Sequence, residues 1–291
     1  MKAVLVPVEI HDSLPSILQA ALLFGRRFGS LVEGFALRPV ITEFVPVDMV
    51  GGLTWTQNDL VDQTEAARAQ ETFETFMREH QLPMAGGPNW NKDQAPPSPD
   101  PQGGLAYRWL ATASAGDAML GEHGRVFDVT VVGRPVSGQI APRMSTLEAA
   151  LFESGRPILI APPTPPRTLG ETIVIAWNGS TETARAVSFA IPLLLRAEKV
   201  TVLTVQSAKV PGPTGEQIAR TLRINGVPAQ ALDVDDEGRS PGEAIRINAE
   251  DLGADLLVKG AYTQSRLRQM IFGGPTRYLL EHATVPMLMA H

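Results

Sequence analysis

Glycines and threonines gather near the C-terminus, between a short apolar run at 256–258 and a stretch of helical pattern. The residues with chemical potential follow in this order: Gly260, Thr263, Gly273, Gly274 and Thr276. Glycine lets backbone N–H groups approach a phosphate, and a helix N-terminus adds partial positive charge. Glycine also serves any strand-to-helix turn that requires a positive φ. Spacing alone therefore leaves both a phosphate site and an ordinary turn open.

The elements that must position this segment follow from an alternation of apolar runs and helical patterns. We expect strands at 3–8, 31–37, 105–111, 126–132, 157–161, 172–177, 199–205, 229–234, 255–258 and 285–290. We expect helices from Ser13 onward and at 60–80, 114–123, 147–154, 181–196, 214–225, 241–252 and 276–282. Strands that alternate with helices predict right-handed crossovers and a parallel sheet covered on both faces.

Three segments interrupt the alternation. Residues 38–58 mix Pro, Gly and aromatic residues and predict a long loop, a candidate lid or partner surface. Residues 85–104 have almost no apolar content and predict a surface excursion. The proline-rich run at 162–170 continues neither a helix nor a central strand, which indicates a linker.

Beyond this linker, the pattern of the first half starts again. Residues 4–8 match 173–177, residues 127–133 match 254–260, and residues 156–161 match 285–290. Three anchors in the same order are difficult to attribute to chance. We therefore expect two related domains, at 1–161 and 171–291, joined by the linker.

The C-terminal segment and the repeat together resemble the universal stress protein family, in tandem form. Its nucleotide-binding members carry Gly, two residues, Gly, nine residues, then Gly and Ser or Thr. This chain matches at Gly260 and Gly273 and departs at Thr263 and Gly274. The resemblance implies two Rossmann-like (adenine nucleotide alpha-hydrolase-like) α/β domains, each with a five-stranded, mainly parallel sheet. It also implies that ATP or another adenine nucleotide is the ligand.

The same resemblance implies where a nucleotide would bind in the second half. Asn178 stands where the family has an aspartate after the first strand, and Val205 matches an apolar position beside the base. The complete set of expected nucleotide-binding residues is Ala176, Asn178, Val205, Lys259, Gly260, Thr263, Gly273, Gly274, Pro275 and Thr276. Judged as a residue type, Asn178 is equally consistent with a helix-capping turn.

The first half is expected to hold a degenerate site. Glu9 takes the acidic position, but the loop after Gly133 lacks the second glycine, and Thr146 and Leu147 replace the final pair. Four side chains of this region could meet an anion, although placement at the surface is the simpler interpretation. They are Arg134, Arg143, Ser145 and Thr146.

Composition limits the remaining possibilities. A formal net charge of −6 argues against a nucleic-acid surface. The sequence contains no run of eighteen apolar residues, so we expect no membrane span. The chain has no cysteine, and its first residues lack a secretory apolar region, which favours the cytoplasm. The five histidines show no metal-binding spacing.

Three functions remain as hypotheses. The first is a stress-response protein that binds an adenine nucleotide in its second half and acts through conformation or an unknown protein partner. The second is an interaction scaffold that has lost nucleotide binding. The third is a slow ATPase, for which the sequence offers no evident general base, so no catalytic residue is expected. The family also implies that the two domains pair internally through their last strands, 157–161 and 285–290, and further homodimerisation is open.

Overall fold

The computed structural model describes residues 1–37, 55–86, 104–111, 116–135, 142–261 and 274–291, with side chains of the second helix from residue 63 onward. Most of the expected loop at 38–58 and of the excursion at 85–104 lies outside these residues. The last part of that loop prediction was wrong, because helix α2 begins at Trp55. Nothing in the Trp-Thr-Gln-Asn-Asp sequence there interrupts a helix, since it contains neither Gly nor Pro.

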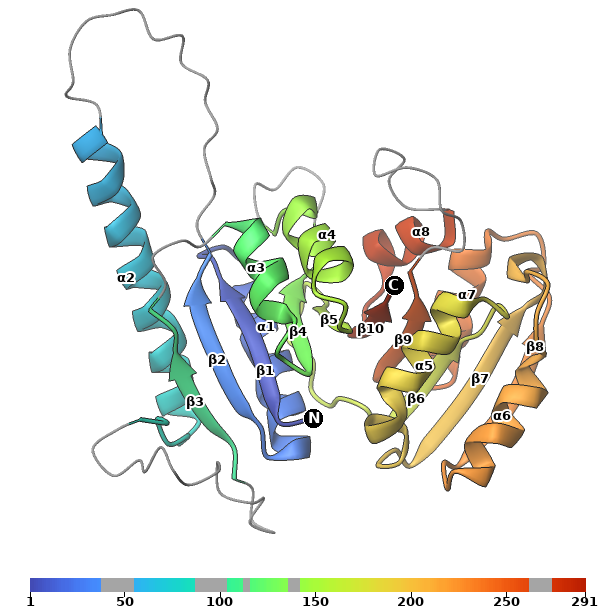
Figure 1. Ribbon diagram of the computed structural model, residues 1–291. Helices are drawn as coiled ribbons and strands as arrows, with labels where there is room; N and C mark the ends of the chain where they lie inside the picture. The colour runs from blue at the N-terminus through green and yellow to red at the C-terminus, as the bar shows by residue number, and fades with distance from the viewer. Residues whose placement is uncertain (38–54, 87–103, 112–115, 136–141, 262–273) are drawn as a thin grey trace, which may run out of the picture.

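The first half has five strands and four helices in alternation (Figure 1). They are β1 (Ala3–Val8), α1 (Leu14–Phe28), β2 (Leu31–Ala36), α2 (Trp55–Glu79), β3 (Ala106–Trp109), α3 (Asp117–Gly124), β4 (Val129–Gly133), α4 (Met144–Glu153) and β5 (Ile158–Ala161). The expected start of β4 at 126 was wrong by three residues. Val126 is exposed in a turn, and the Asp128 side chain accepts a hydrogen bond from the Ala3 amide at 3.0 Å.

The second half repeats the plan with an added 3-10 turn, η1 (Gln206–Ala208). Its other elements are β6 (Thr172–Ala176), α5 (Thr181–Leu194), β7 (Lys199–Val205), α6 (Gly215–Ile224), β8 (Ala229–Val234), α7 (Pro241–Asp251), β9 (Leu256–Gly260), α8 (Gly274–His282) and β10 (Met287–Ala290). Ser180, Thr214 and Ser240 cap α5, α6 and α7 by accepting hydrogen bonds from backbone N–H groups.

All ten strands form one sheet, in the order β3-β2-β1-β4-β5-β10-β9-β6-β7-β8. Within each half the neighbouring strands are parallel, whereas β5 and β10 pair antiparallel at the centre, with Met287 opposite Ile160 (Figure 1). The expected internal pairing through the last strands of the two halves is therefore confirmed. This pairing removes one exposed edge from each half.

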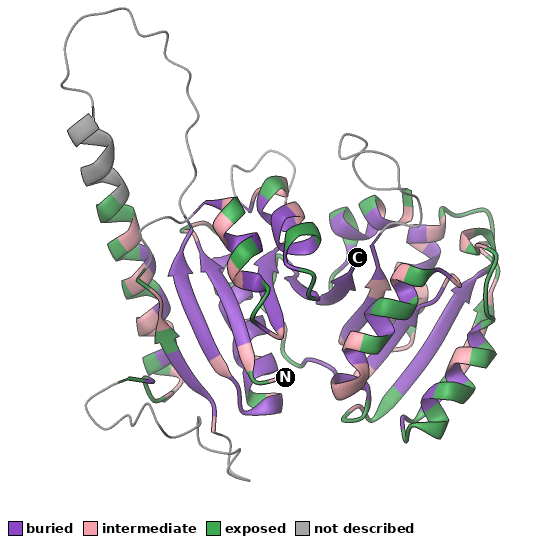
Figure 2. Ribbon diagram, viewed as in Figure 1, coloured by how far each residue is buried: buried purple, intermediate pink, exposed green. Residues whose placement is uncertain are grey.

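Helices cover both faces of the sheet, and most of the strands between them are buried, whereas the edge strand β8 is partly exposed (Figure 2). On one face the core includes side chains of α1, α2, α5 and α6, and on the other face it includes those of α3, α4, α7 and α8. Strands buried on both faces explain the continuous apolar runs in the sequence.

A reciprocal arginine contact joins the two halves away from the central strands; we call it the arginine pair, Arg27 and Arg196. Arg27 donates to the carbonyl oxygens of Gly170 and Arg196, and Arg196 donates to the carbonyl oxygen of Arg27 at 2.6 Å. The Arg196 guanidinium also lies 4.4 Å from the ring centre of Phe28. Each arginine follows or ends a helix, where a positive charge is favourable.

Candidate functional site

The predicted residues of the second half come from the ends of three neighbouring strands. Ala176 ends β6, Val205 ends β7 and Gly260 ends β9, and all three are buried. Carboxyl ends of adjacent parallel strands form the usual ligand edge of an open α/β sheet. Thr263 and Gly273 lie outside the described residues, so their expected part in the site stays a prediction.

Gly260 packs against the beginning of α5. A Cβ atom at this position would lie 2.3 Å from the backbone nitrogen of Thr183 and 2.5 Å from the carbonyl carbon of Glu182. Real Cβ atoms do not approach backbone this closely, so Gly260 is required for the contact between β9 and α5. The glycine thus has a packing role that does not depend on any ligand.

Asn178 builds the turn between β6 and α5. Its side-chain oxygen accepts hydrogen bonds from the Ser180 amide at 3.2 Å and the Thr183 hydroxyl at 2.7 Å. Its carbonyl oxygen accepts from the Val210 amide at 3.0 Å. The side-chain oxygen is committed to this helix-capping turn, so the side-chain amide N–H groups are the part of Asn178 left for a ligand.

The turn after β6 also meets the loop after β7. A Cβ atom at Gly212 would lie 2.2 Å from the carbonyl oxygen of Gly179, and the Trp177 indole N–H donates to the carbonyl oxygen of Pro213 at 2.8 Å. Gly179 has a φ of 86°, which favours glycine. The two loops are therefore held close together at the ends of β6 and β7.

Lys259 places a positive charge at the beginning of α8. Its ammonium group donates to the Thr276 hydroxyl at 2.8 Å and to the Gly260 carbonyl oxygen at 3.0 Å. Although the residue keeps some exposed surface, the ammonium is buried, and this burial lowers the pKa of Lys259 to about 8. Across the described ranges, no carboxylate forms an ion pair with Lys259.

The surrounding sequence is also short of negative charge. Between Asp255 and Glu281 the chain contains four cationic residues and no acidic one. Thr276 is buried, whereas a Cβ atom at Gly274 would meet no atom of the described residues within 4 Å. Pro275 follows in the first turn of α8, where its missing N–H has no cost. The start of α8 is therefore a cationic position with open space beside Gly274.

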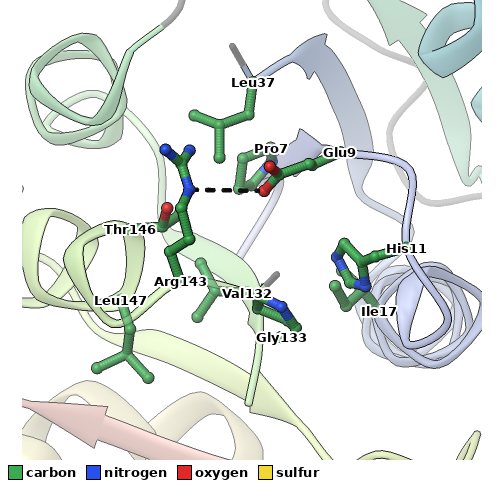
Figure 3. Close-up of a pocket in the computed structure, with 11 residues that line it drawn as sticks. Pro7, Glu9, His11, Ile17, Leu37, Val132, Gly133, Arg143, Thr146 and Leu147 are labelled. Atoms are coloured by element: carbon green, nitrogen blue, oxygen red, sulfur yellow. Dashed lines mark ion pairs between the residues drawn. The ribbon is translucent and has the colours of Figure 1, made fainter. Parts of the chain in front are cut away.

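The corresponding edge of the first half has a small hollow (Figure 3). Its polar lining comes from the loop after β1 and from the start of α4: Glu9, His11, Arg143 and Thr146. Glu9 and Arg143 point toward one another, with 3.9 Å between the carboxylate and the guanidinium, while His11 lies beside Ile17 (Figure 3). The hollow encloses about 10 Å³, which is room for about one water molecule.

An ion network occupies this first-half site. Arg143 lies 3.7 Å from the Asp117 carboxylate, which also accepts a hydrogen bond from the Thr146 hydroxyl at 2.7 Å. Nε and Nη2 of Arg143 are buried and have no hydrogen-bond partner among the described residues. Burial raises the pKa of Glu9 above its ordinary value, and nearby Arg143 opposes that rise. Burial lowers the pKa of His11.

The sequence did not reveal this network. Asp117 was not singled out, and its separation from Glu9 and Arg143 along the chain gives no local signal. Arg134 was expected at the surface, but it is half-buried and donates to the Ala283 carbonyl oxygen at 2.6 Å, across the two halves. Thr146 is buried as well, whereas Ser145 is exposed as expected.

Two kinds of feature are absent from the described part of the chain. No helix there is both long and apolar enough to cross a membrane. Within the same residues, no three His, Asp or Glu side chains are grouped so that they could hold a metal ion.

The fold and the site define a class: two Rossmann-like α/β units in tandem, joined through their last strands. The model of the Universal stress protein family matches residues 170–291. A universal stress protein from Archaeoglobus fulgidus DSM 4304 is similar in structure over 99% of this chain and 96% of that chain, with a TM-score of 0.72 and 12% identity. A putative universal stress protein from Pseudomonas aeruginosa UCBPP-PA14 is similar over 100% and 93%, with a TM-score of 0.51 and 15% identity.

No curated protein matches the chain. The structural similarities, at these identities, concern the fold, and they extend it over both halves. The second half, which the family model matches, is a universal stress protein domain, and the first half shares its fold.

Proposed function

We propose that this protein is a regulatory protein that binds ATP or another adenine nucleotide through its second half. The observation that carries the proposal is the cationic start of α8, where the Lys259 ammonium contacts the Thr276 hydroxyl and has no carboxylate partner within the described ranges. A buried positive charge is stabilised by an anion, and a helix N-terminus favours phosphate.

The residues present fit a phosphate group. Lys259 supplies charge, Thr276 supplies a hydroxyl, and the open space beside Gly274 leaves room at the first turn of α8. The adenine part of the proposal comes from the family resemblance, in which the base lies near the ends of the first two strands. Val205 and the side-chain amide N–H groups of Asn178 are the candidates for that contact.

The first half has a different part in the proposal. Its hollow has room for about one water molecule, and Arg143 already balances the carboxylates of Glu9 and Asp117. We propose that residues 1–161 form a degenerate domain that does not take a nucleotide and instead supports the second half through the shared sheet.

Gly274 offers a matched test. A Cβ atom at this position meets no atom of the described residues within 4 Å, so Gly274→Glu and Gly274→Gln should both fold, and they differ by one charge. We expect ATP, measured by calorimetric titration, to bind the Gln variant within a few-fold of the unmodified protein. The Glu variant should bind about 10- to 100-fold more weakly, because a carboxylate at the start of α8 repels phosphate.

Native mass spectrometry of the purified protein gives the stoichiometry, for which we expect one adenine nucleotide per chain. Equal binding by the Glu and Gln variants would place the phosphate elsewhere. Absence of binding in the unmodified protein to ATP, ADP and AMP would refute the proposal.

A second candidate function is an interaction scaffold without a nucleotide. It is favoured by Asn178, whose side-chain oxygen is already used, and by the close contact between Gly179 and Gly212. The same titration decides between the two functions, since a scaffold of this kind gives no heat with any of the three nucleotides.

A further inference from the structure

The Lys259 ammonium has more N–H donors than acceptors among the described residues. Two of its three N–H bonds have acceptors, Thr276 and Gly260, and the third has none within the described part of the chain. The two acceptors are a neutral hydroxyl and a neutral carbonyl, so neither compensates the charge. A strand end at the ligand edge of the sheet therefore carries a buried cation that has no counter-ion among the described residues.

The charged groups of the neighbouring elements are engaged with one another. On α8, Arg277 pairs with Glu281 at 2.8 Å, and on α7, Arg246 pairs with Glu250 at 2.6 Å. Beyond β7, Lys209 lies 4.0 Å from Asp233. The remaining titratable groups on the elements around Lys259 are Glu182 and Arg185 on α5, Glu243 and Asp251 on α7, Tyr278 and His282, which stack on α8, and His291 after β10.

We propose that Lys259 recognises the phosphate charge of the ligand, and that a fully ionised phosphate, when it binds, draws a proton onto Lys259 in those molecules whose amine is neutral. This inference rests on the proposed function. In the reaction, a neutral Lys259 amine, a proton from the buffer and the nucleotide polyphosphate combine into an ammonium–phosphate ion pair, and no covalent bond forms or breaks. The ligand class is thus a nucleotide, which carries phosphate, rather than a nucleoside.

The proton count follows from linkage between binding and protonation. Burial lowers the pKa of Lys259 to about 8 in the free protein, so about half of the molecules carry a neutral amine at pH 8. A bound phosphate favours the charged form and raises this pKa. Binding at pH 8 should therefore take up about half a proton, and affinity should fall by up to about tenfold per pH unit above the free-state pKa.

Calorimetry measures this proton directly. ATP is titrated at pH 8.0 in HEPES and in Tris, whose ionisation enthalpies differ, and the difference in binding heat gives the protons taken up. Phosphate groups have their second pKa near about 6, so ATP itself is fully ionised and contributes none. The same titration is repeated with adenosine, which carries no phosphate.

Two substitutions at Lys259 and one elsewhere complete the test. Lys259→Met should reduce ATP affinity about 10- to 100-fold and abolish proton uptake, because one charge-assisted hydrogen bond is lost. Lys259→Arg should bind more tightly than the Met variant without taking up a proton, because a guanidinium stays charged. Lys199→Met is the matched control, since Lys199 is exposed at the start of β7, and it should behave like the unmodified protein. Thermal melts establish that each variant is folded.

The outcomes separate this inference from the proposed function. Proton uptake of about half, lost in the Met and Arg variants and absent with adenosine, supports the inference. ATP binding without uptake, and with equal affinity in Lys259→Met, overturns the inference and leaves the nucleotide-binding function standing. No binding of ATP by the unmodified protein overturns both.

Discussion

Replacement of Gly260 by alanine tests whether this glycine serves a ligand or the fold. The added Cβ atom would lie within 2.3 to 2.8 Å of three backbone atoms of Glu182 and Thr183. Ordinary contacts begin near 3.4 Å, so the first turn of α5 must move by about 1 Å or β9 must shift. Because the opposing atoms belong to the backbone, they cannot move aside as a flexible side chain would.

The magnitude is set by two opposing effects. Overpacking of a core costs about 1 to 3 kcal/mol, and a backbone contact belongs at the upper end of that range. Alanine reduces the conformational entropy of the unfolded chain, which raises the free energy of unfolding by about 0.4 to 1 kcal/mol. We therefore expect Gly260→Ala to lower the free energy of unfolding by about 2 kcal/mol, a factor of about 30 in the ratio of folded to unfolded protein.

The measurement is urea unfolding without nucleotide, followed by intrinsic tryptophan fluorescence. Gly274→Ala is the matched control, because a Cβ atom there meets no atom of the described residues within 4 Å, and its midpoint should stay close to that of the unmodified protein. Equal midpoints for the two variants would refute the packing role of Gly260. The reasoning about the β9–α5 contact would then be wrong.

Two further predictions concern the arginine pair and Glu9. Arg27→Ala should lower the free energy of unfolding by about 1 to 2 kcal/mol, because the carbonyl oxygens of Gly170 and Arg196 lose a charged donor. The control is Arg26→Ala, which should change the free energy little because Arg26 is exposed. Equal urea midpoints for the two variants would contradict a role of Arg27 in joining the halves. Burial raises the pKa of Glu9, so the folded state holds its proton more tightly than the unfolded state, and stability should fall as pH rises from the ordinary value to the raised one. Glu9→Gln should flatten this part of the stability curve, measured by urea unfolding from pH 4 to 7, and an unchanged slope would show that another group causes it.

Much of the fold could be predicted because the signals are local or repeated. Apolar runs separated by helical patterns indicated every strand and helix present in the structure, with errors mainly at the ends. The three repeated anchors and the family resemblance indicated the pairing of β5 with β10. Asp255 shows why the repeat is informative: its carboxylate accepts from the amides of Gly170 and Thr172, each at 3.0 Å, as Asp128 does from Ala3 in the first half.

The candidate sites were less accessible to prediction, for a physical reason. The network of Glu9, Asp117 and Arg143 depends on side chains from three separate elements, which only the folded chain brings together. A glycine pattern indicates where the backbone is crowded, but it does not say whether the crowding atom belongs to a ligand or to the protein. At Gly260 that atom belongs to α5.

The antiparallel contact between β5 and β10 has a consequence for stoichiometry. Because residues 162–171 join the two halves into one chain, β5 meets β10 at an effective concentration in about the millimolar range, whatever the amount of protein in solution. Dilution therefore cannot separate the two halves in the way that it separates two subunits. Every molecule also contains one half with the α8 cation and one half with the Arg143 network, so the ratio of the two is fixed at synthesis and does not vary with expression level.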